Sequence, residues 1–135
     1  MSRLKTLREY VDKELNLLEE EKRTSATAHL YGVSLAATIL AKKRGLNEEL
    51  AAMAAMLHDM HAYKSGSYED HAHLGADLAR KILDDLAITT SEETDIICSA
   101  IYHHDDKLVI DSPMDELLKD ADVIMAAVNE QALTS

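Results

Sequence analysis

The sequence predicts an all-α protein that folds as a single-domain bundle of about six helices. It contains only four glycines and one proline, so it offers few turn residues. Apolar residues recur at spacings of three and four along most of the chain, and the one short β-branched run, 107–110, is expected to be loop. A length of 135 residues corresponds to one domain, 1–135, without a repeat or an interdomain linker.

The first helix is predicted by a stripe of apolar residues: Leu4, Leu7, Val11, Leu15 and Leu18. It is expected to end near residues 19–23. A second helix is predicted to begin at Thr24 or Ser25 and to end at Gly45, because glycine commonly closes helices.

Two further helices are predicted in the middle of the chain. Asn47 is the expected N-cap of a third helix over 48–60. Residues 61–70 contain Gly66 between two serines and are predicted to form a loop. A fourth helix follows from about Asp70 to Leu86.

Two helices complete the predicted bundle. Thr90 and Glu93 have the spacing of a capping box, which predicts the start of a fifth helix that ends near residue 104. Residues 105–113 are expected to form a second loop. Pro113 then opens a sixth helix that continues to about residue 128.

The formal net charge of −11 disfavours binding to a nucleic-acid polymer or to an anionic membrane. A small phosphate ester can still bind where local cations or a metal reverse the sign. Cys98 is the only cysteine, so no intrachain disulfide is expected. Residues 1–15 do not resemble a signal peptide, and no apolar run reaches membrane-spanning length, so a cytoplasmic protein is expected.

The chain has seven histidines, none of which lies in the first or the last predicted helix. His29 shares the inward stripe of the second helix with Val33. A single histidine on such a face is more often a hydrogen-bonded core residue than a metal ligand.

His58 and Asp59 end the apolar third helix, where adjacent ionisable groups need partners. They either cap this helix at the surface or hold an ion that compensates for their burial. A histidine nitrogen with a carboxylate oxygen suits zinc, iron, manganese or a similar metal.

Polar residues in the later helices extend the pattern. His71 shares a helix face with Gly75, whereas His73 points away from it. His103 and His104 close the apolar face of the fifth helix.

Asp122 lies among apolar residues of the sixth helix and therefore needs a partner, whereas Asp120 is expected on a polar face. The ordered set is a histidine, a His-Asp doublet, a histidine, a histidine pair and an aspartate. Each lies on its own helix.

This order resembles the HD-domain superfamily of metal-dependent phosphohydrolases. The resemblance runs from His29 to Asp122, which leaves 1–22 as an additional N-terminal helix and 24–130 as the metal-site core. The segments MLHDM, HAHLGADLA and KDADV are similar to the small stand-alone bacterial members of that superfamily.

The resemblance implies that one divalent metal is bound by four residues: His29, His58, Asp59 and Asp122. In two-metal members a second ion is held by the equivalents of His71 and of either His103 or His104, with Asp59 as the bridge. The resemblance leaves open whether one or two ions bind, and whether they are Mn, Fe, Zn, Mg, Ni or Co.

Two features depart from relatives. Many have Gly-Lys after the doublet, where this chain has Met60-His61-Ala62 and its nearest lysine is Lys64. The branch that cleaves cyclic-di-GMP has Gly-Tyr-Pro after its paired histidines, and this motif is missing here.

The expected function is hydrolysis of a phosphate ester by metal-activated water, with His58 and Asp59 at the catalytic centre. Lys64 and Lys107 follow the two histidine segments and are candidates to hold the substrate phosphate, or else are ordinary loop lysines. A nucleotide substrate is implied by the resemblance alone. The alternative is a non-catalytic metal- or nucleotide-binding sensor or interaction module.

The first helix can pack on its own bundle or on a second subunit, which would make a homodimer.

Overall fold

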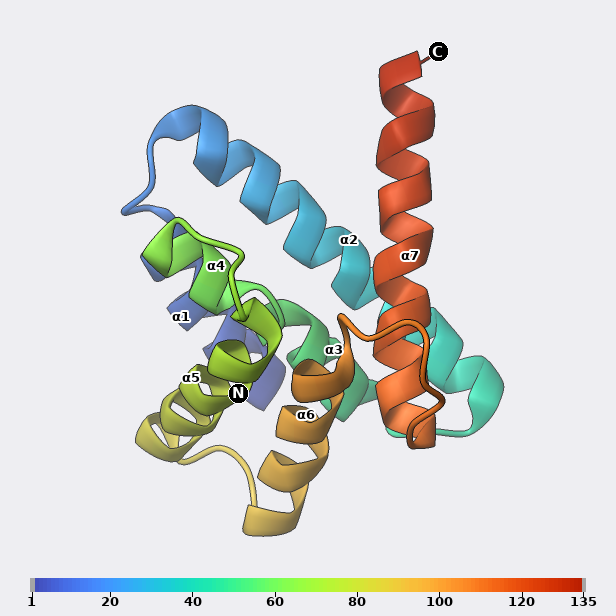
Figure 1. Cartoon of the computed structure of the whole chain (residues 1–135). Helices are drawn as coiled ribbons and strands as arrows, with labels where there is room; N and C mark the ends of the chain where they lie inside the picture. The colour runs from blue at the N-terminus through green and yellow to red at the C-terminus, as the bar shows by residue number, and fades with distance from the viewer. Residues whose placement is uncertain (1, 135) are drawn as a thin grey trace.

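The computed structural model describes residues 2–134, and side chains for residues 2–128. This part of the chain forms α-helices and no strand, as the sequence predicts (Figure 1). The helices are α1 Arg3–Leu15, α2 Glu20–Arg44, α3 Glu48–Leu57, α4 Met60–Ser65, α5 His71–Leu86, α6 Ser91–His103 and α7 Pro113–Thr134. None of these helices is both long and apolar enough to cross a membrane.

The main differences from the predicted helices lie around the first two loops. The first helix ends at Leu15 rather than near 19–23, and the second begins at Glu20 rather than at Thr24 or Ser25. Acidic side chains in the first turn of α2 are favoured by the helix dipole, which explains the earlier start. The predicted loop over 61–70 instead begins with the short helix α4, which ends at Gly66 in a left-handed conformation.

Helix α3 forms the centre of the bundle. Every residue from Leu50 to Leu57 is buried, because α1, α2, α6 and α7 all pack against this helix (Figure 1). Alanine and methionine dominate its sequence, so small side chains allow the surrounding helices to approach closely. The residues that follow α3 therefore emerge inside the bundle rather than at its surface.

The N-terminal helix α1 packs on its own chain. Its apolar stripe Leu7, Val11 and Leu15 is buried. The Arg3 guanidinium binds carboxylate oxygens of Glu49 at 2.6 Å and of Glu93 at 2.7 Å, so it connects the starts of α1, α3 and α6. The hydrogen bond from Arg3 lowers the pKa of Glu93 to about 2.

The predicted capping box at the start of α6 is present. The Thr90 side chain accepts a hydrogen bond from the Glu93 backbone N–H, and the Glu93 side chain accepts one from the Thr90 backbone N–H. Thr90→Ala should lower the free energy of unfolding by about 1 kcal/mol, because an N-cap acceptor is lost. Urea denaturation followed by circular dichroism measures this. Thr90→Ser keeps the acceptor and should stay close to wild type; equal losses in both variants would contradict the capping role.

Candidate metal centre

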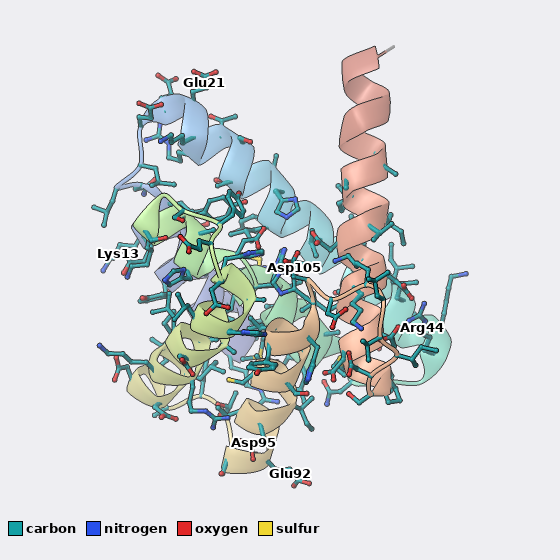
Figure 2. The ribbon with its side chains drawn as sticks, in the orientation of Figure 1. Lys13, Glu21, Arg44, Glu92, Asp95 and Asp105 are labelled. Carbon is teal, nitrogen blue, oxygen red and sulfur yellow. The ribbon has the colours of Figure 1, made fainter. Side chains whose placement is uncertain are left out.

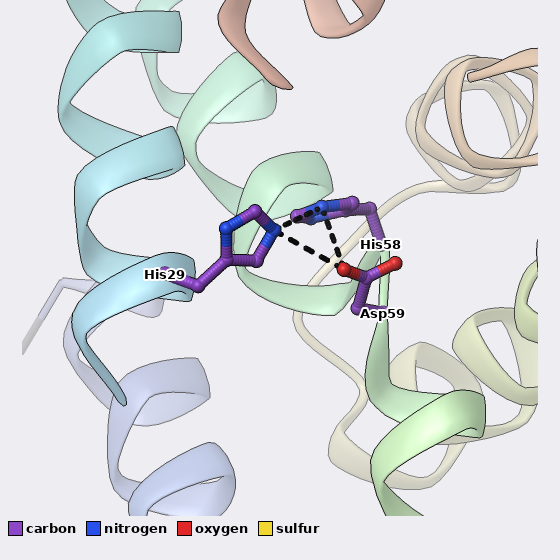
Figure 3. Close-up of side chains that lie close together, drawn as sticks. All are labelled: His29, His58 and Asp59. Carbon is purple, nitrogen blue, oxygen red and sulfur yellow. Dashed lines mark hydrogen bonds and ion pairs between the residues drawn. The ribbon is translucent and has the colours of Figure 1, made fainter. Parts of the chain in front are cut away.

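The His58-Asp59 doublet lies at a break between two helices. Helix α3 ends at Leu57, His58 is its C-cap, and Asp59 leaves the helical conformation with φ −111° and ψ 9°. Adjacent residues on a continuous helix point about 100° apart. The break allows both side chains to turn toward His29 of α2, as Figure 3 shows.

Two histidine nitrogens lie close together, and one carboxylate oxygen each from Asp59 and Asp122 lies beside both of them. His29 Nε2 lies 3.2 Å from Asp59 Oδ2 and 3.3 Å from His58 Nε2, and the latter two atoms are 3.3 Å apart. Asp122 Oδ1 lies 3.4 Å from His29 Nε2 and 3.5 Å from His58 Nε2. Ligands about 2.1 Å from one tetrahedral ion are separated by about 3.4 Å. The spacing and the N/O donor set therefore fit a divalent metal.

The second oxygen of Asp59 faces a different pair of histidines. Its Oδ1 lies 3.5 Å from His71 Nε2 and 3.6 Å from His104 Nε2. These three residues could hold a metal as a group of their own. Asp59 is thus placed between two ligand groups, with one carboxylate oxygen toward each.

Backbone carbonyls fix the orientation of three imidazoles. His58 Nδ1 lies 2.6 Å from the Ala55 oxygen, and His71 and His104 repeat this contact to the carbonyl three residues earlier, at 2.9 Å and 2.6 Å. A carbonyl can only accept, so each Nδ1 donates its hydrogen. Each Nε2 is then left with a lone pair directed at the cluster, as a metal ligand requires.

The electrostatics of the cluster favour a cation. Burial alone would lower the pKa of His58, but the charges and hydrogen bonds of Asp59 and Asp122 together outweigh it and raise that pKa to about 10. Burial would raise the pKa of Asp122, yet hydrogen bonds from His29 and His58 hold it well below its usual range. In the protein alone a proton therefore supplies the positive charge that a metal ion would bring, and metal binding would displace that proton.

The structure distinguishes the two members of the late histidine pair. His104 is 1% exposed and joins the cluster, whereas His103 turns away toward α7. His103 Nδ1 donates to the Ser99 carbonyl at 2.8 Å and lies 3.2 Å from Asp115 Oδ2. The structure therefore separates His103 from the cluster that the other predicted ligands form.

His103 forms a separate group with Asp111 and Asp115 that also contains a cation. Lys119 Nζ lies 2.8 Å from a carboxylate oxygen of Asp111 and 2.8 Å from one of Glu116. This buried ammonium offsets part of the negative charge of Asp111 and Glu116, and these salt bridges tie the loop before α7 to that helix.

The two aspartates near the end of the chain also take different roles. Asp122 faces the cluster, whereas Asp120 pairs with Arg44 at 2.7 Å. On α5, His71 faces the cluster, whereas His73 is exposed and pairs with Asp70 at 2.9 Å. Both divisions agree with the predicted helix faces.

The two candidate lysines lie in different places. Lys107 Nζ is 3.5 Å from Asp122 Oδ2 and donates to the His104 carbonyl, so it lies beside the cluster. Lys64 Nζ is 3.4 Å from Glu14 of α1 and lines a different cavity. The structure therefore places Lys64 away from the site for which it was a candidate.

Gly75 of α5 packs behind the doublet. A β-carbon at this position would lie 3.5 Å from the His58 carbonyl oxygen, which is an ordinary van der Waals distance. An alanine would therefore fit here without displacing the cluster.

The cluster forms the floor of a cavity of about 610 Å³. Sequence reasoning missed the residues of its walls, since none of them belongs to a motif. They are Leu18, Lys22, Ser25, Ala26, Ala62, Tyr63, Gly66, Tyr68 and Asp105. Burial of its ring raises the pKa of Tyr63, and the nearby Asp59 charge acts in the same direction.

A family model and one solved structure match this chain. A family model described as HD domain matches residues 27–127. The crystal structure of a predicted HD superfamily hydrolase from an uncultured Thermotogales bacterium superposes with a TM-score of 0.68 and 22% sequence identity, covering 91% of this chain and 74% of that chain. At this identity the likeness shows the fold alone. No curated protein matches the sequence.

Asp122→Ala should weaken divalent-metal affinity by at least roughly tenfold, because it removes one of four converging ligand atoms. Isothermal titration with Mn²⁺ into chelator-treated protein measures the change. Asp120→Ala is the matched control, since it removes a carboxylate two residues away that pairs with Arg44. Equal affinity of the Asp122 variant and wild type would exclude Asp122 as a ligand.

His104→Ala should remove the second metal equivalent while leaving the first, because His104 belongs to the group around Asp59 Oδ1. His103→Ala should leave the stoichiometry unchanged. Elemental analysis of both variants after dialysis against metal gives the number of ions per chain. A loss in the His103 variant and none in the His104 variant would reverse the assignment.

Proposed function

The chain belongs to the HD-domain family, and from this membership and its site we propose a metal-dependent phosphohydrolase that cleaves a phosphate ester of a nucleotide or a related small molecule. One observation carries the proposal: the Asp59 carboxylate lies between two groups of ligand atoms on the floor of an open cavity. Such an arrangement suits one ion or a bridged pair.

Each described ligand has a defined place in the proposed site. His29, His58 and Asp59 would hold the first ion together with Asp122, whose oxygen lies beside both histidines. His71 with His104 would complete the second through Asp59. A bound divalent ion lowers the pKa of its water and polarises a phosphoryl oxygen. The backbone carbonyls behind His58, His71 and His104 keep the rings in place, so little reorganisation is needed when an ion binds.

Lys107 is the cation best placed to hold the phosphate. Its ammonium lies 3.5 Å from Asp122 Oδ2, at the edge of the cluster. An ammonium there can donate a charge-assisted hydrogen bond to a phosphate oxygen without displacing a ligand atom. Lys22 lines the same cavity and adds a second positive charge. These local charges are needed because the chain as a whole has a net charge of −11.

The cavity walls support an ester with an organic group. The volume of about 610 Å³ falls within the range of small-molecule sites. Leu18, Ala26 and Ala62 supply apolar contacts, and the Tyr68 ring is 60% exposed on the same wall. A planar base could stack on this ring, which favours a nucleoside phosphate over a polyol phosphate.

The proposal is tested by hydrolysis assays on chelator-treated protein with and without added Mn²⁺. The substrates are nucleoside monophosphates, a sugar phosphate and an aryl phosphate, with phosphate release as the readout. Phosphate release that requires metal and prefers the nucleotides is expected. Tight metal binding without hydrolysis of any ester would favour the alternative, a non-catalytic binding module.

Lys107→Ala should lower kcat/KM by roughly ten- to a hundredfold, because a charge-assisted hydrogen bond contributes about 1.5–3 kcal/mol. Metal content should not change. Lys64→Ala is the matched control and should stay within about twofold of wild type, because Lys64 lies against Glu14 instead. Steady-state kinetics on the best ester decide this, and equal activities of both variants would exclude Lys107 from phosphate binding.

A further inference from the structure

The outward face of α2 carries an exposed stripe with a symmetric spacing. Its six residues are Glu21, Thr24, Ala28, Leu35, Ile39 and Lys42, and all of them are exposed. They succeed one another at intervals of three, four, seven, four and three residues, which places them on one face of a helix. The intervals read the same in both directions, with the midpoint between Tyr31 and Gly32.

The side chains of the α2 stripe are complementary about that midpoint. In an antiparallel pair of α2 helices, Glu21 of one copy would face Lys42 of the other, and Ala28 would face Leu35. The small Ala28 leaves room for the large Leu35. Thr24 would face Ile39, and its hydroxyl is already bonded to the Glu20 carbonyl, so its methyl group is free to pack. In such a pair the ends of the two stripes would form ion pairs, and their middle parts would form apolar contacts.

The stripe faces solvent in the isolated chain. Leu35 is 64% exposed and Ile39 is 48% exposed, although both lie within a long, regular helix. Helix α2 runs along one edge of the bundle (Figure 1), and Glu21 and Arg44 lie at its two ends (Figure 2). The two large apolar side chains, Leu35 and Ile39, lie one turn apart, and oppositely charged residues stand at the two ends of the same face, which indicates an interface rather than isolated exposure.

Helix α7 packs against α2 beside this stripe. Met125 packs against Gly32, at the midpoint of the stripe. Beyond that point α7 continues past the body of the bundle (Figure 1), with Ile124 42% and Val128 51% exposed. The stripe is only about 31 Å long, whereas a stable interface buries roughly 800 Å² on each partner. Contacts from α7 would therefore be needed to complete the interface.

We propose that two copies of this chain form a symmetric dimer in which their α2 helices pack antiparallel, flanked by the two α7 helices. The same patch is used by both copies, as two-fold symmetry requires. The ion pairs between Glu21 and Lys42 occur twice and fix the direction and the register of the helices.

The proposal is tested on the full chain by sedimentation equilibrium. Wild type should have twice the chain mass of 15.0 kDa at roughly 50 µM. Leu35→Lys should weaken the dimer by at least roughly a hundredfold, because two unpaired ammonium groups would be buried. The matched control is Leu74→Lys, which changes an exposed leucine on α5. Circular dichroism checks that both variants are folded.

Charge reversal tests the register. Glu21→Lys and Lys42→Glu should each weaken the homodimer by roughly tenfold. An equimolar mixture of the two variants should form a heterodimer with wild-type affinity, because each contact then joins a lysine to a glutamate, one pair in the original sense and one reversed.

Three results would overturn the proposal. They are a monomeric wild type at the concentration above, a dimer that resists Leu35→Lys, and a charge-reversed mixture that is no stronger than either variant alone. Recovery in the mixture supports the antiparallel register, since a change in folding of either variant would persist on mixing.

Discussion

The buried carboxylate of Asp59 is the constraint on which the rest of the structure depends. It is only 7% exposed, and an ionised carboxylate at that depth is unfavourable without partners. It lies next to four imidazole nitrogens, which come from α2, from the ends of α3 and α6, and from α5. A second carboxylate, from α7, lies beside two of these imidazoles. Because each of these residues has a fixed position in the sequence, bringing them together constrains how the helices pack against one another. The Ala-rich core of α3 brings them close enough.

Much of the helical pattern could be predicted because its causes are local. The capping box at Thr90 and the apolar stripe of α1 both depend on residues within a few positions of one another. The break after Leu57 and the short helix α4 could not be predicted this way. They depend on contacts with α5 and with the cluster, which come from distant parts of the chain. That break is also what allows two consecutive residues to face one ion.

The same division between local and distant causes applies to the site. Helical periodicity predicted that Asp122 rather than Asp120, and His71 rather than His73, faces the site. Two residues that are two positions apart on one helix point in different directions. Periodicity could not separate His103 from His104 at a helix end, where the last turn sets the direction of each ring. Lys64 and Lys107 looked equivalent in sequence, and only the packing of α4 against α1 shows that Lys64 pairs with Glu14.

The charges of the cavity link metal binding to substrate binding. Three carboxylates line it, from Asp59, Asp105 and Asp122, against the ammonium groups of Lys22 and of Lys107 beside it. Without metal, a proton on His58 offsets one of these negative charges, because the pKa of His58 is raised. A divalent ion in place of that proton would make the cavity positive, and a second would make it strongly so. In the proposed phosphohydrolase, metal binding would therefore favour an anionic ester at this one site, while the rest of the acidic surface repels larger polyanions.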